Sequence, residues 1–322
     1  FLKKNLKNCK ILSIDNLSKN YSKFNQAILN KNKIKNKKID LGNSNLFNKI
    51  NFKADYIIDC SAEPAVEISK KKTVKVIESN FLSTVNILQK VKKDNSKLIF
   101  ISSSRVYPIT ESYKKFKRYK KLGKHLPYKE ESNFNDTKTI YGFTKYCSEH
   151  LIKEYNYSEN TKFIINRCGL ISGPGQYGKV EQGLVALWMW RHINKMDVTY
   201  LGHGGNGNQV RDVLFIKDLC KLILIQIKQF KKFENEIFCI GGGTKNAINL
   251  KNLTKLCQNI TKNKIKIMKN LNTSIYDIPY YVTSINKINK ISNWKPRINL
   301  SQGLLEIYNW MIVNKKKIKK FF

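Results

Sequence analysis

Short apolar runs alternate in the first part of the chain with longer stretches in which apolar residues recur at helical spacing. The short runs are rich in β-branched residues and lie at 10–15, 55–59, 97–102, 162–166 and 236–240. Residues 73–93 and 139–155 have the helical spacing. Strands and helices in alternation predict a parallel sheet that is covered by helices on both faces. The predicted fold class is therefore α/β, with a doubly wound parallel sheet.

The pattern changes after residue 167. Glycine-rich turns, an apolar segment at 183–192 and short elements follow, which predicts a smaller C-terminal lobe over 168–322. Segments around 209–240 are expected to return to the sheet of the first domain, residues 1–167. A basic run at 114–124 has the composition of a solvated surface insertion, and that is our interpretation of it.

Composition adds one question, which is the source of the high positive charge. The 322 residues include 60 Lys and Arg against 23 Asp and Glu, a formal charge of +37, while 41% are hydrophobic, enough for a buried core. Clustered basic residues would indicate nucleic-acid binding. Here the lysines are spread along the chain between Asn and Ile, as AT-rich codon usage produces. We therefore expect no specific nucleic-acid partner, although a positive field favours an anionic substrate such as a nucleotide diphosphate.

The cysteines and the hydropathy pattern exclude several classes of protein. Seven cysteines are scattered without a C-x-x-C pair, which is typical of reduced thiols in a cytoplasmic protein and predicts neither a disulfide framework nor a metal site. The chain has no run near the ~20 apolar residues of a membrane span and no secretory h-region at its start. We expect no membrane partner.

The segment Tyr141-Gly-Phe-Thr-Lys145 carries the first candidate chemistry. Spacing of i, i+4 places the phenol and the ammonium on one helical face. An ammonium beside a phenol favours the phenolate, so Lys145 is expected to lower the pKa of Tyr141 and make it a general base toward a sugar hydroxyl. Alone, the same spacing also fits an amphipathic helix with a packed Tyr and a solvated Lys.

A second candidate motif lies about forty residues upstream. The apolar strand 97–101 ends in Ser102, Ser103 and Ser104. Hydroxyls at the carboxyl end of a parallel strand lie where open α/β sheets bind ligands, and one of them could orient the reacting oxygen. The alternative is that these serines only cap the following helix.

Together, the two motifs resemble the extended short-chain dehydrogenase/reductase family of NAD-dependent nucleotide-sugar epimerases and dehydratases. Segments 14–18, 55–66, 80–86, 209–218 and 294–296 carry the same resemblance. Within the family, the sequence is most similar to the CDP-paratose 2-epimerase (CDP-tyvelose epimerase) branch, through residues 103–107, 166–174, 178–189, 241–246 and 277–283. The resemblance implies a Rossmann-like fold with residues 1–167 as the NAD-binding domain and the C-terminal lobe as the substrate-binding part.

The resemblance also implies roles for individual residues. The catalytic set is Ser103, Tyr141 and Lys145. NAD is held by Asp15, Asn16, Ser18, Asp40, Leu41, Ala62, Glu63, Tyr141, Lys145 and Cys168, and a nucleotide-diphosphate sugar, with a CDP-hexose favoured, by Ser104, Arg105 and Arg211. The carboxylate of Asp15 would repel a 2′-phosphate, so NAD is expected rather than NADP. Asp40 could instead cap a turn, and Arg211 could instead pair with Asp212.

The implied reaction is inversion at C2 of the hexose by transient oxidation to a ketone and return of hydride. A 4-epimerase or a 4,6-dehydratase of the same fold is the alternative. A dehydratase needs an Asp-Glu pair after the catalytic hydroxyl, where this chain has Ser104-Arg105. Outside this class, a basic nucleic-acid-binding or inactive homologue is the remaining interpretation. The resemblance further implies a homodimer or homotetramer, formed through the long helices that include Asn80 and Tyr141.

The family begins with a strand and a G-x-x-G-x-x-G loop that holds the pyrophosphate. This sequence begins inside the predicted first helix, residues 1–8. We therefore expect the first strand and the glycine-rich loop to be missing from this polypeptide, and we expect it to bind NAD poorly.

Overall fold

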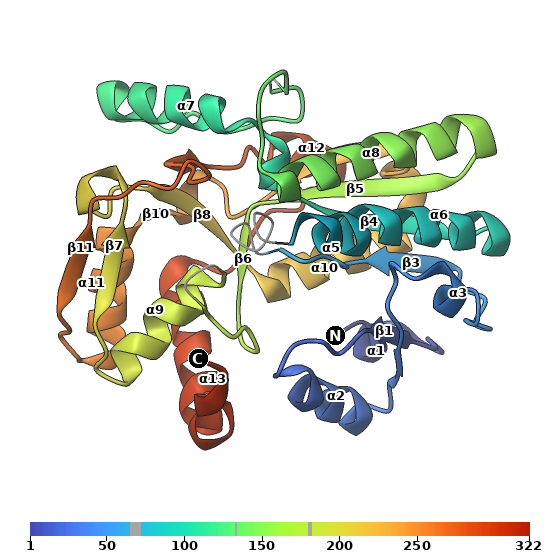
Figure 1. Ribbon diagram of the computed structural model, residues 1–322, viewed down its shortest axis with the longest axis horizontal. Coiled ribbons are helices and arrows are strands. Elements are labelled where there is room, and N and C mark those ends of the chain that lie inside the picture. Colours follow the sequence, from blue (N-terminus) through green and yellow to red (C-terminus); the bar gives the residue numbers. More distant parts are fainter. Residues whose placement is uncertain (65–71, 133, 180–181) are drawn as a thin grey trace.

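The main sheet of the protein is parallel and has four strands. In the computed structural model, which describes residues 1–64, 72–132, 134–179 and 182–322, its order is β3-β4-β5-β9 (Figure 1). The strands are β3 (Tyr56–Asp59), β4 (Lys97–Ser103), β5 (Lys162–Cys168) and β9 (Glu236–Ile240). Every pairing is parallel, which confirms the α/β prediction. Two of the segments that carry the family resemblance, 55–66 and 178–189, each include residues outside the described ranges.

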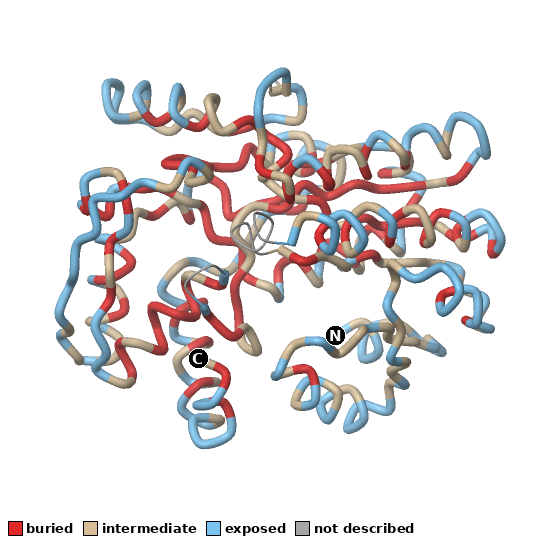
Figure 2. The backbone as a smooth tube through the Cα atoms, viewed as in Figure 1, coloured by how far each residue is buried: buried red, intermediate tan, exposed pale blue. Residues whose placement is uncertain are grey.

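Helices cover both faces of this sheet. Successive side chains of each strand point to opposite faces, so apolar residues of one strand pack against helices on both sides. Leu98 and Phe100 of β4 pack under α6 (Ser83–Asp94) and α8 (Ile140–Glu159). Ile99 packs on the opposite face, against α10 (Ile216–Lys228). The two faces of the sheet therefore belong to separate apolar clusters, and Figure 2 shows the strands between them as buried.

The remaining helical segments connect or flank the sheets. The α-helices are α1 (Leu2–Asn5), α2 (Ser22–Lys31), α3 (Ser44–Phe47), α5 (Thr73–Ile77), α7 (Ile109–Leu122), α9 (Leu184–Ile193), α11 (Leu250–Thr261), α12 (Asn286–Ser292) and α13 (Leu300–Ile318). The short turns are η1 (Glu78–Leu82), η2 (Ser104–Val106), η3 (His203–Gly205), η4 (Phe230–Lys232), η5 (Thr244–Asn246) and η6 (Lys319–Phe321). The helix predicted over 73–93 is thus α5 and α6 joined through η1, a π-helical turn.

The N-terminal strands form a small sheet of their own. β1 (Leu12–Asp15) pairs in parallel with β2 (Lys35–Lys38), and neither strand pairs with the main sheet. This unit lies below the main sheet in Figure 1 and is mostly exposed or intermediate in Figure 2. The expectation about a missing strand and glycine-rich loop stays a prediction.

The C-terminal half contributes two further sheets. β8 (Val210–Phe215) lies at the centre of one, between β10 (Ala247–Asn249) and β12 (Tyr280–Tyr281), and also pairs with β6 (Leu170–Ser172). β7 (Val198–Leu201) pairs with β11 (Ile267–Asn270) in the other. β9 returns to the main sheet beside β5. The division of the chain at residue 167 stays a prediction.

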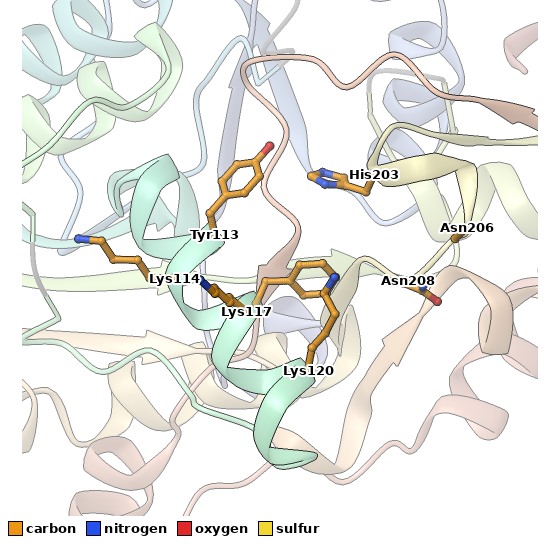
Figure 3. A pocket seen from close by; sticks show the side chains of 8 residues that line it. Tyr113, Lys114, Lys117, Lys120, His203, Asn206 and Asn208 are labelled. Atoms are coloured by element: carbon orange, nitrogen blue, oxygen red, sulfur yellow. The ribbon is translucent and has the colours of Figure 1, made fainter.

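The basic side chains of segment 114–124 are mostly exposed, as predicted (Figure 3), but the segment is also packed on one face, which was not predicted. It lies mainly in α7, whose Phe116 is only 7% exposed and whose Ser112 hydroxyl donates to the carbonyl of Tyr280 on β12 at 2.7 Å. One face of the helix is therefore packed against the C-terminal half, and only the other face is a solvated lysine surface. Among the described residues, no helix is both long enough and apolar enough to span a membrane.

Candidate active site

The predicted catalytic residues meet where β4 ends and α8 begins. Thr139 caps α8 by accepting the amide N–H of Gly142 at 2.9 Å. A Cβ on Gly142 would stand 2.1 Å from the carbonyl oxygen of Arg105, so glycine is what allows the helix to approach η2 this closely. That approach brings Tyr141 within hydrogen-bonding contact of Ser103.

Lys145 lies one turn after Tyr141 and is almost fully enclosed, with 2% of its surface exposed. Its ammonium donates to the carbonyl oxygens of Ser61 at 3.1 Å and Ile101 at 3.2 Å, and it lies 4.4 Å from the ring centre of Phe100. Burial lowers the pKa of Lys145, and the carboxylate of Asp59 opposes this shift. The alternative of a solvated lysine on an amphipathic helix is therefore wrong.

Our prediction of a lowered Tyr141 pKa is also wrong for this structure. Tyr141 is 9% exposed, and burial raises the pKa of its phenol. The hydrogen bond from Ser103 and the guanidinium of Arg105 act in the opposite direction. Desolvation dominates because the ammonium of Lys145 is turned to the carbonyls of Ser61 and Ile101.

A buried ion pair between Glu149 and Arg167 lies beside the site. The two carboxylate oxygens of Glu149, one turn beyond Lys145, share the single N–H of Arg167 Nε at 3.0 and 3.1 Å, and one of them also accepts from Nη2 at 2.7 Å. The hydroxyl of Ser102 donates to the same carboxylate at 2.5 Å. Helix α8 is therefore joined to both β4 and β5 beside Ser103. Our sequence reasoning missed this pair, although the spacing Y-x3-K-x3-E was the available signal.

Asn80 is a second residue whose place the sequence did not predict. Its side-chain oxygen accepts the amide N–H of Glu63 at 2.7 Å, and its Nδ2 donates to Thr144 Oγ1 at 3.1 Å and to the Glu63 carbonyl at 3.4 Å. Asn80 lies in the π-helical turn η1, a feature that is frequent at functional sites. It joins the loop after β3 to the helix that carries Tyr141.

The residues predicted to hold the adenosine half of a dinucleotide lie at the carboxyl ends of β1 and β2. The carboxylate of Asp15 accepts the amide N–H of Leu17 at 2.6 Å. Asn16 donates from Nδ2 to Asp40 at 3.4 Å and accepts the amide of Ser18 at 3.1 Å. The structure therefore brings the segment after β1 next to the segment after β2.

Asp40 and the neighbouring predicted cofactor residues also stabilise local structure. Asp40 accepts the amide N–H of Gly42 at 3.0 Å, as the turn-capping alternative predicts. The carbonyl of Leu41 accepts a hydrogen bond from Asn86 at 2.7 Å.

The loop after β3 contacts the N-terminal unit. Ala62 is half-buried there and Glu63 is buried, and Glu63 forms an ion pair with Lys19 at 2.7 Å. This ion pair links the N-terminal unit to the main sheet.

Cys168 is the register partner of Ser103 on the adjacent strand and is buried, so the pKa of its thiol is raised.

The predicted substrate residues converge on one carboxylate. Nη1 of Arg105 donates to the carbonyl of Tyr276 at 2.7 Å, and Nη2 of Arg211 lies 3.7 Å from Asp277. Burial and the nearby charge of Arg211 together lower the pKa of Arg105 to about 10, against the opposing effect of the Asp277 carboxylate. The ion-pair partner of Arg211 is Asp277, and not Asp212 as in the alternative to diphosphate binding. The charges of the two guanidiniums act on each other, which favours the binding of an anion between them.

The sequence profile of the NAD dependent epimerase/dehydratase family matches residues 2–241. The chain belongs to this family. It is an NAD-dependent enzyme, as the resemblance implied.

Named relatives and solved structures agree with this membership. The CDP-paratose 2-epimerase of Salmonella typhi is 28% identical over 244 residues, 72% of this chain and 70% of that protein. The UDP-glucuronate 4-epimerase of Thermodesulfobacterium geofontis is 24% identical over 318 residues, 96% of this chain and 90% of that protein. The fold is similar to that of a UDP-glucose 4-epimerase of Thermotoga maritima, with a TM-score of 0.81, 22% identity, and coverage of 98% of this chain and 94% of that one.

The residues of this family member fit NAD. Asp15 presents an exposed carboxylate at the end of β1, where ribose hydroxyls need an acceptor. The ammonium of Lys145 has three N–H donors, and the two carbonyl contacts described above leave one for a nicotinamide ribose hydroxyl. Within the described ranges, no three His, Cys, Asp or Glu side chains come together as a metal site would require.

Proposed function

We propose that this family member is an NAD-dependent nucleotide-sugar epimerase that inverts C2 of an NDP-hexose, with a CDP-hexose as the favoured substrate. The observation that carries the proposal is the meeting of Ser103 and Tyr141 beside the buried Lys145. The similarity to a CDP-paratose 2-epimerase supports the choice of carbon and nucleotide.

Each of the three residues has a role in this chemistry. When bound, NAD takes hydride from the sugar carbon and later returns it. Tyr141 as phenolate accepts the proton of the reacting hydroxyl, and Ser103 donates a hydrogen bond to the oxygen as it becomes a carbonyl. Lys145 holds the nicotinamide ribose. Inversion would require the ketone to turn its other face to the cofactor before hydride returns, and Tyr141 would then give the proton back to the oxygen.

The half-buried arginines suit the diphosphate of this substrate. Arg211 donates to the carbonyls of Val210 and Ile278, and Arg105 donates to that of Tyr276. Each guanidinium has further N–H donors for phosphate oxygens, in a planar fork that a lysine lacks.

Ser104 begins η2, directly after Ser103 and before Arg105. Because Ser104 and Arg105 stand where a dehydratase needs its carboxylic acids, elimination of water lacks an acid. A 4-epimerase is the second candidate, and the similarity to a UDP-glucuronate 4-epimerase favours it.

One experiment tests both candidates. The protein is incubated with NAD and CDP-, GDP- or UDP-hexoses, and the configuration at C2 and C4 is followed by NMR. We expect inversion at C2 of a CDP-hexose. Inversion at C4 alone would establish the second candidate, and loss of water would contradict both.

The raised pKa of Tyr141 predicts an alkaline pH dependence. Only the phenolate accepts the proton, and burial raises its pKa above the ordinary value of about 10, so kcat should increase with pH through the neutral range. The guanidinium of Arg105 stabilises the phenolate, so Arg105→Gln should shift the pH profile of kcat to higher pH. Arg105→Lys keeps the positive charge and should shift it less. An unchanged or acid-shifted profile in Arg105→Gln contradicts this assignment.

We also propose that a second copy of the chain covers the groove between α5 and α8. This groove of about 840 Å³ is lined by Ile77, Phe81, Ile140 and Phe143 among others, and Phe143 is 57% exposed. Exposed apolar side chains gathered on one surface are typical of interfaces. The proposal covers a homodimer, or a homotetramer built from such dimers.

A charge in the middle of this groove should separate the copies. We expect Phe143→Glu to move the protein from dimer to monomer in light scattering coupled to size-exclusion chromatography, because a carboxylate buried in an apolar contact is strongly disfavoured. Tyr157→Glu is the control, since Tyr157 is an exposed aromatic residue near the other end of the same helix. A dimer that persists in Phe143→Glu contradicts the proposed interface.

Cytoplasmic location and the absence of a specific nucleic-acid partner stay predictions.

A further inference from the structure

Lys145 is a buried ammonium that forms no ion pair with any residue in the described ranges. Two of its three N–H groups donate to the carbonyls of Ser61 and Ile101, which leaves the third for the nicotinamide ribose. A neutral amine has only two N–H groups, and these two carbonyls would take both. The ability of Lys145 to donate to the ribose therefore depends on its positive charge, which burial disfavours.

Asp59, the last residue of β3, lies on the same face of the sheet as this ammonium. It is the register partner of Phe100 on β4, and register partners on neighbouring strands direct their side chains to one face. Nζ of Lys145 lies 4.4 Å from the ring centre of Phe100. Burial lowers the pKa of Lys145, and the charge of Asp59 is the largest of the effects that raise it. A carboxylate that is only 3% exposed thus stabilises a buried ammonium.

The two carboxylate oxygens of Asp59 have different surroundings. Oδ1 accepts the amide N–H of Ser61 at 2.8 Å and the hydroxyl of Ser61 at 2.6 Å. Oδ2 is buried and accepts no hydrogen bond from a described residue. The turn that Oδ1 holds also directs the carbonyl of Ser61 to Lys145 at 3.1 Å. Asp59 therefore acts on Lys145 in two ways, through this turn and by its charge.

The other groups whose charges favour the ammonium are less able to compensate it. They are the carboxylate of Glu149 and the thiols of Cys60 and Cys168. Glu149 is already paired with Arg167 at 2.7 Å. Thiols have an ordinary pKa of about 8.5, so they carry little negative charge at neutral pH. Among these groups, Asp59 is thus the carboxylate without a cation of its own in the described part of the chain.

We propose that Asp59 is a positioning residue for Lys145, because one of its oxygens holds the turn beside the ammonium and its charge compensates the ammonium. It thereby keeps the third N–H of Lys145 available to the nicotinamide ribose. The alternative is that Asp59 only caps the turn after β3, as aspartates often do. This inference rests on the proposed function, since it concerns the role that the proposed function gives to Lys145.

The first test is the titration of Lys145, followed by NMR of the full chain with ¹³C at lysine Cε, in the absence of NAD and sugar. Lys145→Arg identifies the signal. We expect the pKa of Lys145 to be lower in Asp59→Asn than in the wild type. Both hydrogen bonds from Ser61 go to one oxygen, which asparagine retains, so the substitution changes the charge and keeps the turn.

Asp94→Asn is the matched control. Asp94 is also a buried aspartate, and it accepts the amide N–H of Ala54 at 3.0 Å, before the start of β3 and not at its carboxyl end. Its substitution removes the same charge from the same domain and should leave the pKa of Lys145 unchanged.

The second test is the pH profile of kcat. The increase of kcat with pH that Tyr141 predicts should end at a lower pH in Asp59→Asn than in the wild type, because Lys145 loses its proton earlier. Above the lowered pKa, the charged fraction of Lys145, and kcat with it, should fall about tenfold for each pH unit. A purely structural defect lowers kcat without moving the profile. Asp94→Asn should keep the wild-type profile.

The outcomes separate this inference from the proposed function. Equal titration of Lys145 in the wild type and Asp59→Asn overturns the inference, and so does an equal fall of the pKa in Asp94→Asn. A lower pKa in Asp59→Asn with an unmoved pH profile of kcat contradicts the positioning role. A lower pKa in a protein that epimerises no NDP-hexose keeps the link between Asp59 and Lys145 and overturns the proposed function. Thermal melting of each variant establishes that it is folded.

Discussion

Replacement of Tyr141 by Phe is expected to lower kcat for epimerisation by about 10²–10⁴-fold, the range that a positioned general base contributes. The substitution removes only the phenolic oxygen, and the ring keeps its packing because Tyr141 is buried at the start of α8. NAD binding and the melting temperature should therefore change little. Steady-state kinetics with the CDP-hexose and calorimetric titration with NAD measure the two parts of this prediction.

A second phenol on the same helix provides the control. Tyr146 lies one turn further along α8 and stacks on Phe134 instead of facing Ser103. Tyr146→Phe removes the same oxygen atom from the same helix and should leave kcat within about twofold, the scale of surface changes away from the site. If Tyr141→Phe retained most of the activity of Tyr146→Phe, another group would have to accept the proton.

Glu149→Ala should reduce the free energy of unfolding by about 3–5 kcal/mol, because the change leaves the guanidinium of Arg167 buried without a counter-charge. Burial lowers the pKa of Arg167, but the Glu149 carboxylate outweighs this and leaves the pKa raised. Without Glu149, burial would lower the pKa of Arg167, but an arginine starts from so high a pKa that the guanidinium stays charged when its partner is removed. A typical domain has only about 5–15 kcal/mol of stability, so the loss would be severe. Urea denaturation followed by circular dichroism measures it.

An exposed ion pair on the same helix provides the control for Glu149→Ala. Glu159 at the end of α8 pairs with Lys92 at 2.8 Å, and both side chains are largely in solvent. Glu159→Ala should cost about 0–1 kcal/mol, as exposed ion pairs do. The double change Glu149→Leu/Arg167→Met should recover part of the loss, because it removes both buried charges. Similar losses of unfolding free energy in Glu149→Ala and Glu159→Ala would show that burial does not determine how much the Glu149–Arg167 pair contributes to stability.

The sequence predicted the residues of the main sheet well because strands buried on both faces leave a clear apolar signal. The strands predicted at 55–59 and 236–240 are β3 and β9 of the structure, within one residue of their bounds. The sequence did not predict η1 inside the helix over 73–93, because a π-helical turn changes hydrogen bonding without changing the apolar spacing. It also missed α7 as a packed helix, because the seven basic residues of segment 114–124 concealed the buried position of Phe116.

By itself, the sequence determined the α/β architecture and the presence of Tyr141, Lys145 and Ser103 in motifs of one family, since local spacing and residue type are encoded residue by residue. Only the tertiary structure decided the direction of the Tyr141 pKa shift, because desolvation depends on atoms from β4, η2 and β5 that surround the phenol. It likewise decided that Arg211 pairs with Asp277, 66 residues away, instead of the adjacent Asp212. Neighbours along a strand point to opposite faces, so an adjacent charge in the sequence is seldom the partner in space.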